Sequence, residues 1–80
     1  MSDNSFILLY TLGCHLCDDA EIIIKNITED YIKQDIIEDD KLMKKYATSI
    51  PVLLHTKTAE ALYWPFDHIQ LVAFIKTCTD

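Results

Sequence analysis

Apolar and polar positions follow one another in blocks, and each block has the length of a strand or a helix. Residues 5–10 (SFILLY) form a continuous apolar run, which is typical of a strand covered on both faces. We therefore expect this strand at the centre of a sheet. The next block has helical spacing and predicts an amphipathic helix of about four turns. Its apolar face consists of Leu16, Ala20, Ile23, Ile24 and Ile27.

The middle of the chain predicts two further strands with a short helix between them. Residues 31–37 are a strand candidate, and the acidic group 38–40 supplies an N-cap and first-turn carboxylates for the helix that follows. Residues 50–54 predict a strand with Pro51 at its beginning, a position where the missing N–H costs no ladder bond. The apolar face of the short helix is marked by Leu42, Met43, Tyr46 and Ala47.

The C-terminal part predicts a hairpin and a helix with a well-marked start. Residues 56–60 are polar and predict the turn between the previous strand and a fourth strand at 61–64. Asp67 is the expected N-cap of the helix, and Gln70 completes a capping box. Phe66 precedes the cap and is placed to staple onto the apolar face, which consists of Leu71, Phe74, Ile75 and Cys78.

The predicted element order, β-α-β-α-β-β-α, indicates an α/β fold with a four-stranded mixed sheet flanked by helices. The first β-α-β unit must cross over right-handed, and the last two strands form a hairpin. The chain has 80 residues, of which 50% are hydrophobic, so it can build one modest core. We therefore expect a single domain over residues 1–80.

Charge and composition narrow the classes of partner. The formal net charge is −6, there is no Arg, and the seven Lys and Arg positions, all Lys, are scattered. Neither nucleic acid nor an anionic membrane suits such a surface, so a basic or neutral protein surface is the expected partner. The N-terminal apolar run is too short for a signal sequence or a membrane span. We therefore expect a cytosolic protein, and a monomer.

Two cysteines stand three positions apart where the first strand gives way to the first helix, in residues 13–17 (GCHLC). Gly13 is the only glycine and suits the tight turn at this point. Thiols at this spacing face one way on a first helical turn, so they can close a disulfide ring. Unpaired N–H groups and the helix dipole favour a thiolate nearer the helix start. We therefore predict Cys14 as the nucleophile and Cys17 as the resolving thiol.

Other interpretations of the pair stay open. Cys14, His15 and Cys17 are also donors for zinc or for a shared iron-sulfur cluster, but zinc takes four ligands and the chain has no second Cys pair. We therefore predict no metal. A thioredoxin-like adaptor that only binds a partner is the non-chemical alternative. For His15, a catalytic cation or proton carrier beside Cys14 and an exposed spacer are both open.

Several nearby or reactive residues receive separate expectations. Asp18, Asp19 and Glu21 follow the thiols within a turn and a half, and their negative charge disfavours a thiolate. Cys78 falls on an apolar stripe, so we expect an inert, partly buried thiol. The two other histidines are expected at the surface rather than as ligands: His55 and His68.

The element order, with a CxxC pair after the first strand, resembles the thioredoxin superfamily and most closely its small glutaredoxin-like proteins. The resemblance covers nearly the whole chain and rests on residues 10–17 (YTLGCHLC), 50–52 (IPV) and 64–67 (WPFD). It implies a thiol-disulfide oxidoreductase that reduces protein or small disulfides. It also implies that the proline at position 51 is cis and lies against the dithiol, and that the substrate meets Tyr10, Thr11, Ile50 and Pro51.

The resemblance also bears on the reductant, which in glutaredoxins is glutathione. Those proteins usually carry a Lys shortly before the first Cys and a Gly-Gly segment before the last helix, whereas this chain has residues 11–13 (TLG) and 64–67 (WPFD) there. Without that cation and those backbone donors, the carboxylates of glutathione lack obvious partners. We therefore expect no bound cofactor, weak binding of glutathione, and reduction by a thioredoxin-type system or a dedicated partner protein.

Overall fold

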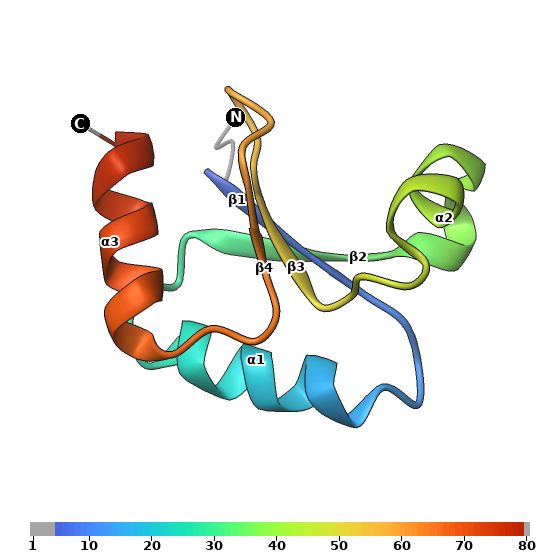
Figure 1. Ribbon diagram of the computed structural model, residues 1–80, viewed down its shortest axis with the longest axis horizontal. Coiled ribbons are helices and arrows are strands. Elements are labelled where there is room, and N and C mark those ends of the chain that lie inside the picture. The colour runs from blue at the N-terminus through green and yellow to red at the C-terminus, as the bar shows by residue number, and fades with distance from the viewer. Residues whose placement is uncertain (1–4, 80) are drawn as a thin grey trace.

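The computed structural model describes residues 5–79 and contains a four-stranded sheet with helices on both of its faces (Figure 1). The strands are β1 (Phe6–Tyr10), β2 (Tyr31–Asp35), β3 (Val52–His55) and β4 (Ala61–Tyr63). The helices are α1 (His15–Lys25), α2 (Asp40–Tyr46) and α3 (His68–Thr79), and a 3-10 turn, η1 (Ile36–Glu38), precedes α2. This is the predicted order of helices and strands, so the predicted fold class is confirmed.

The sheet has the order β2-β1-β3-β4, which places β1 inside it as predicted. β1 runs parallel to β2, with Leu8 opposite Lys33, and antiparallel to β3, with Leu8 opposite Leu53. β3 and β4 form the predicted antiparallel hairpin. The sheet is therefore mixed, with its one parallel pair joined through α1.

Two apolar clusters, one on each face of the sheet, explain the unbroken apolar run of β1. Leu8 belongs to the larger cluster, which also holds Ala20 and Ile24 of α1 and Leu71 of α3. Its neighbour Leu9 belongs to the smaller cluster, described by Leu9, Ile36, Tyr46 and Val52, on the side of α2. Because successive side chains of a strand point to opposite faces, a strand between two cores has no polar positions to spare.

α1 is shorter than predicted, and its predicted apolar face is confirmed at every position except Leu16: Ala20, Ile23, Ile24 and Ile27 lie in or against the larger cluster. The helix has 11 residues, or about three turns. Leu16, which we expected in the core, is 51% exposed, whereas Cys17, Ala20 and Ile24 are buried. These three positions follow helical spacing, and Leu16 is displaced from them by one residue, or about 100° around the axis.

β2 ends two residues earlier than predicted. The Asp35 carboxylate accepts a hydrogen bond from the Ile37 backbone N–H at 3.1 Å and begins η1. A local side-chain bond of this kind competes with strand pairing. Ile37 is 66% exposed as a result.

α2 begins where the acidic group predicted it, because Asp39 caps the helix through the N–H groups of Lys41 and Leu42. Two of the four residues predicted for its apolar face are confirmed in the core, and the other two are exposed. Tyr46 is 4% exposed and Leu42 packs beside it in the smaller cluster, whereas Met43 is 37% exposed and Ala47 is exposed. One residue of helical rotation separates the two pairs.

β3 starts at Val52 rather than at residue 50. The Ile50 N–H donates to the Tyr46 carbonyl at 3.2 Å, and Pro51 has no N–H to offer a neighbouring strand.

β3 extends to His55, which we expected at the surface but which is only 3% exposed. The centroid of its ring lies 5.2 Å from that of the Phe6 ring, and its Nδ1 lies 2.9 Å from the Thr58 hydroxyl oxygen. The hydroxyl supplies the polar partner that burial of an imidazole requires. His68 is exposed, as expected.

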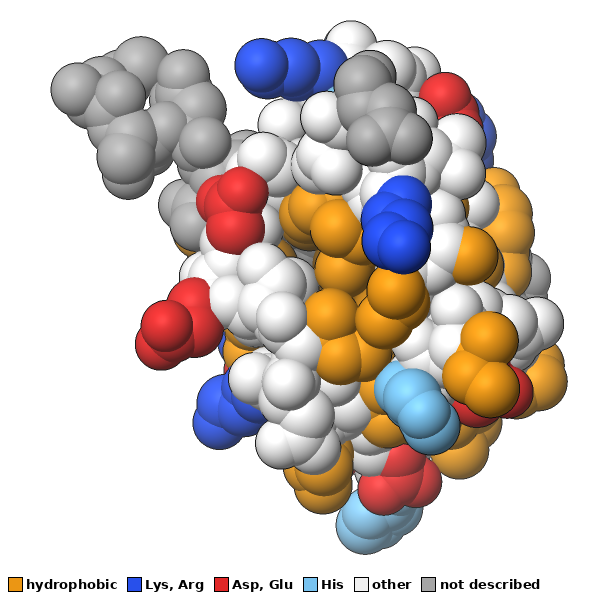
Figure 2. All heavy atoms as spheres, turned by 90° about the vertical axis from the view of Figure 1, so that its left-hand side faces the viewer, with side chains coloured by type: hydrophobic (Ala, Val, Ile, Leu, Met, Phe, Trp, Pro, Cys, Tyr) orange, Lys and Arg blue, Asp and Glu red, His pale blue; other side chains and the backbone are white. Residues whose placement is uncertain are grey.

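The predicted start of α3 is confirmed. The Gln70 N–H donates to the Asp67 carboxylate at 2.8 Å, and the Asp67 N–H donates to the Gln70 side-chain oxygen at 3.0 Å. Phe66 and Leu71 lie in the same core cluster, as a hydrophobic staple requires. The outer side of α3 is apolar too, with Ile69 69% exposed, and Figure 2 shows apolar side chains gathered on this face.

Two positions with positive φ give a test of the backbone. Gly13 has φ 81°, where glycine is favoured, and Ala59 has φ 61° in the hairpin turn, where alanine is strained. We expect Gly13→Ala to lower the free energy of unfolding by about 1 kcal/mol, and Ala59→Gly to raise it by about 0.5 kcal/mol after the greater entropy of the unfolded chain is counted. Urea unfolding of the oxidised protein measures both changes.

Ala73→Gly is the control, because Ala73 is exposed within α3, where glycine costs about 1 kcal/mol. If Ala59→Gly destabilises the protein as much as Ala73→Gly does, the backbone at residue 59 is not strained.

Candidate functional site

The site begins where β1 leaves the sheet and turns into α1. Gly13 makes the turn with φ 81°, and Cys14 follows in an extended conformation (φ −93°, ψ 102°) as the N-cap of α1. The turn needs the glycine because an L side chain rarely adopts that φ. The first cysteine therefore sits at the very start of the helix, as the sequence predicted.

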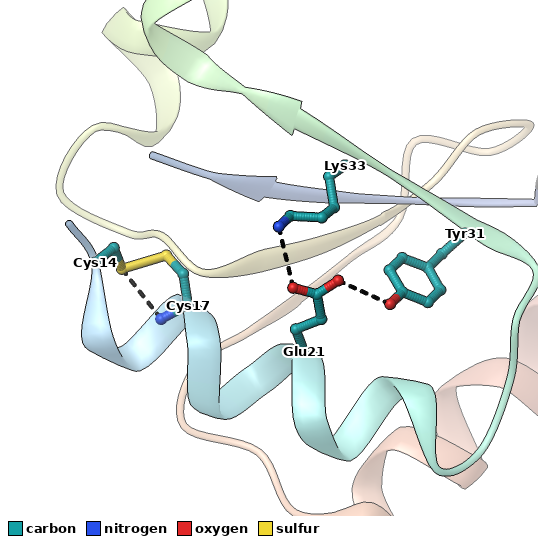
Figure 3. Close-up of polar contacts among 5 residues, drawn as sticks. All are labelled: Cys14, Cys17, Glu21, Tyr31 and Lys33. Carbon is teal, nitrogen blue, oxygen red and sulfur yellow. Dashed lines mark hydrogen bonds and ion pairs between the residues drawn. A yellow bond between two sulfur atoms is a disulfide. The ribbon is translucent and has the colours of Figure 1, made fainter. Parts of the chain in front are cut away.

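Cys14 and Cys17 are joined by a disulfide, with their Cα atoms 5.2 Å apart (Figure 3). The Cys17 backbone N–H donates to Cys14 Sγ at 3.1 Å, so the sulfur fills the role that an oxygen usually has at an N-cap. This N–H is one of the unpaired donors of the first helical turn. A thiolate on Cys14 would be stabilised by the same donor and by the helix dipole.

The two sulfurs differ in access. Cys17 is 3% exposed and belongs to the buried side of α1, whereas Cys14 is only partly buried. Two exposed leucines flank Cys14 in the chain, Leu12 at 80% and Leu16 at 51%. The first cysteine is therefore accessible from outside, next to two exposed leucines in the chain, and the second is not.

The other predicted site residues lie in three places. His15 is the exposed first residue of α1, and Tyr10 and Thr11 are half-buried at the end of β1. Ile50 is half-buried and Pro51 is buried in the segment before β3, and the peptide bond between them is cis. The Pro51 carbonyl accepts a hydrogen bond from the Trp64 N–H at 3.3 Å, which ties this segment to the end of β4.

A charged cluster beside the dithiol was missed by sequence reasoning. Glu21 of α1 accepts a hydrogen bond from the Tyr31 hydroxyl at 2.9 Å, and it pairs with Lys33 Nζ at 3.1 Å (Figure 3). Lys33 also lies over the Tyr10 ring, 4.4 Å from its centroid. Glu21 is therefore not the free negative charge that we expected near the thiols.

The pKa values in this cluster reflect the pairing. Burial raises the pKa of Glu21, but hydrogen bonds from Lys33 and Tyr31 and the Lys33 charge lower it below its usual value overall. The hydrogen bond to Glu21 raises the pKa of Lys33 against the effect of burial. Burial, followed by the bond to Glu21, raises the pKa of Tyr31 to about 12. All three groups keep their paired forms at neutral pH.

The sequence alone could not predict this charged cluster, because it does not give the register in which β2 pairs with β1. Lys33 and Tyr31 are two residues apart on β2 and face one side of the strand. Their meeting with Glu21 depends on α1 crossing between β1 and β2 and on its rotation about its own axis. The one available signal was a Lys in the middle of a predicted strand, because Lys is depleted in strands; its side chain is 39% accessible beside Glu21.

Cys78 lies elsewhere. It is a free, half-buried thiol near the end of α3 and packs against the larger core cluster. Burial and the charge of Glu60 raise the pKa of its thiol. The end of α3 lies far from the start of α1 in Figure 1.

Within residues 5–79, no three His, Cys, Asp or Glu side chains form a group that could hold a metal ion. In the same residues, no helix is long and apolar enough to cross a membrane.

Comparison with known proteins agrees with this geometry. Residues 5–76 match the model of the glutaredoxin-like domain (DUF836). The X-ray structure of Northeast Structural Genomics target protein XcR50 from X. campestris is 28% identical, with a TM-score of 0.80 over 90% of this chain and 96% of that chain. The solution structure of XcR50 gives a TM-score of 0.72 at 28% identity, over 91% of this chain and 94% of that chain. No curated protein is significantly similar. The chain belongs to the glutaredoxin-like domain family.

Proposed function

We propose that the protein is a thiol-disulfide oxidoreductase that acts as a monomer on protein or small disulfides in the cytosol, without a bound cofactor. The Cys14 thiolate attacks one sulfur of the partner disulfide, and the partner's other sulfur leaves as a thiolate. The Cys17 thiolate then attacks Cys14 Sγ in the mixed disulfide, which releases the partner's second thiol and closes the Cys14–Cys17 bond. A reductant returns the pair to the dithiol.

The observation that carries this proposal is the asymmetry of the pair. Cys14 is reachable and its sulfur has an N–H donor at 3.1 Å, whereas Cys17 is 3% exposed. A nucleophile must meet its substrate and be stabilised as a thiolate. A resolving thiol only has to reach the neighbouring sulfur. These properties support Cys14 as the nucleophile and Cys17 as the resolving thiol.

The surroundings of Cys14 favour a protein partner. Leu12 and Leu16 are exposed on either side of it in the chain, and Asp18 and Asp19 are exposed on the same helix. Apolar side chains beside the partner's cysteine would bury the leucines, and basic side chains would complement the carboxylates.

Glutathione fits these surroundings less well. Lys33, a cation on this side of the molecule, is already paired with Glu21 at 3.1 Å. A glutathione carboxylate would have to displace Glu21 from it. We therefore propose that a protein reductant serves this chain better than glutathione does.

The roles of the cysteines can be tested by trapping. In a Cys78→Ser background, Cys17→Ser should accumulate a mixed disulfide with an oxidised protein substrate, because Cys14 attacks and nothing resolves the intermediate. Cys14→Ser should accumulate none, since Cys17 is buried. Non-reducing electrophoresis and mass spectrometry of the conjugate measure both. Equal trapping by the two variants, or trapping by neither, would contradict the assigned roles.

The reductant can be tested by comparing two systems at equal driving force. We expect the oxidised protein to be reduced roughly tenfold more slowly by glutathione with its reductase than by thioredoxin with its reductase, because one missing charge-assisted hydrogen bond weakens binding by about that factor. An ordinary dithiol glutaredoxin serves as the control. Turnover with glutathione as fast as that of the control would show that the chain has a working glutathione groove.

A further inference from the structure

The proposed thiol-disulfide exchange assigns no role to the cluster of Glu21, Tyr31 and Lys33. Glu21 stands four residues after Cys17, so the two side chains leave the same side of α1 about one turn apart (Figure 3). The carboxylate is fixed by the Tyr31 hydroxyl at 2.9 Å and by Lys33 Nζ at 3.1 Å. A negative charge is thus held in place close to the resolving cysteine, with a cation held against it.

Lys33 interacts with several charged or titratable groups on this side of the dithiol. It lies 4.4 Å from the centroid of the Tyr10 ring, and Asp18, the residue after Cys17, acts on it as well as Glu21. Lys25, one turn further along α1, adds a weaker attraction for Glu21. The charged or titratable residues of α1, β1 and β2, besides the cysteines, are His15, Asp18, Asp19, Glu21, Lys25, Tyr10, Tyr31, Lys33 and Asp35.

We propose that Lys33 is a positioning residue for the redox reaction, which neutralises Glu21 beside the dithiol and thereby sets the equilibrium between the Cys14–Cys17 disulfide and the reduced pair. The inference rests on the proposed function. It assigns a role to two residues of different elements that the sulfur chemistry itself does not involve.

The sign of the effect follows from the charges of the two redox states. The disulfide is uncharged at sulfur, and reduction adds two electrons and one proton to give a Cys14 thiolate and a Cys17 thiol. A bare carboxylate on α1 opposes that new negative charge, and a bare ammonium favours it. With Lys33 and Glu21 paired, the two effects largely cancel.

Charge-removing variants should therefore shift the equilibrium in opposite directions. With dithiothreitol, which reduces the protein as it closes its own disulfide, Lys33→Met should lower the equilibrium constant for reduction roughly three- to tenfold. Glu21→Gln should raise it by a similar factor, and the double variant should return to within about twofold of the parent. A tenfold change corresponds to about 30 mV for this two-electron couple. The pH midpoint of thiolate formation should rise in Lys33→Met and fall in Glu21→Gln.

Matched controls separate electrostatics from structure. Lys57→Met and Glu38→Gln make the same changes of net charge at exposed positions outside the cluster and should leave the equilibrium unchanged. Lys33→Arg keeps the cation and should keep the parent value. Because the pair is partly exposed, with side chains 39% and 18% accessible, salt at about 1 M should reduce the difference between Lys33→Met and the parent.

The result that would overturn the proposal is a shift of the same sign in Lys33→Met and Glu21→Gln, which a loss of packing would give, or shifts no larger than those of the controls. The measurement needs only a reversible disulfide and no enzymatic turnover. Failure of the proposed function would appear instead as the expected opposite shifts in redox equilibrium together with no exchange on any disulfide substrate.

Discussion

The rotation of α1 about its own axis is the constraint on which the site depends. Ala20 and Ile24 are fully buried against the sheet, and Cys17 continues the same stripe toward the start of the helix. Burial of side chains at helical spacing leaves the helix no freedom to turn. Once that stripe is fixed, Cys17 is inside, Leu16 is outside, and Glu21 faces β2. Core packing, rather than any feature of the sulfurs themselves, thus buries one cysteine and leaves the other accessible.

β1 connects this helix to the rest of the fold. It is held on one face by Leu8 in the larger cluster and on the other by Leu9 in the smaller one. A strand fixed from both faces delivers the chain to the turn at Gly13 in a defined direction. The cap at Cys14 therefore belongs to a rigid scaffold, and the loop has only three residues between β1 and the cap in which to vary.

The sequence was sufficient for the order of the elements and for the dithiol. The unbroken run of β1 and the capping box of Asp67 and Gln70 are local signals, and the structure has both. The errors lie where packing decides. Leu16 and Cys17 are equally compatible with an apolar face, and only contact with the sheet selects Cys17. The burial of His55 depends on Thr58, in a turn whose shape the sequence leaves open.

The three carboxylates after the dithiol show why counting charges was insufficient. Glu21 is paired with a cation, so it adds little net field, whereas Asp18 and Asp19 are exposed and act through water and salt. The Cys17 N–H, by contrast, touches Cys14 Sγ at 3.1 Å. Electrostatic energy falls with both distance and screening, so one donor in contact outweighs exposed charges further away. The first turn of α1, rather than the negative composition of the chain, therefore dominates the local electrostatics at Cys14.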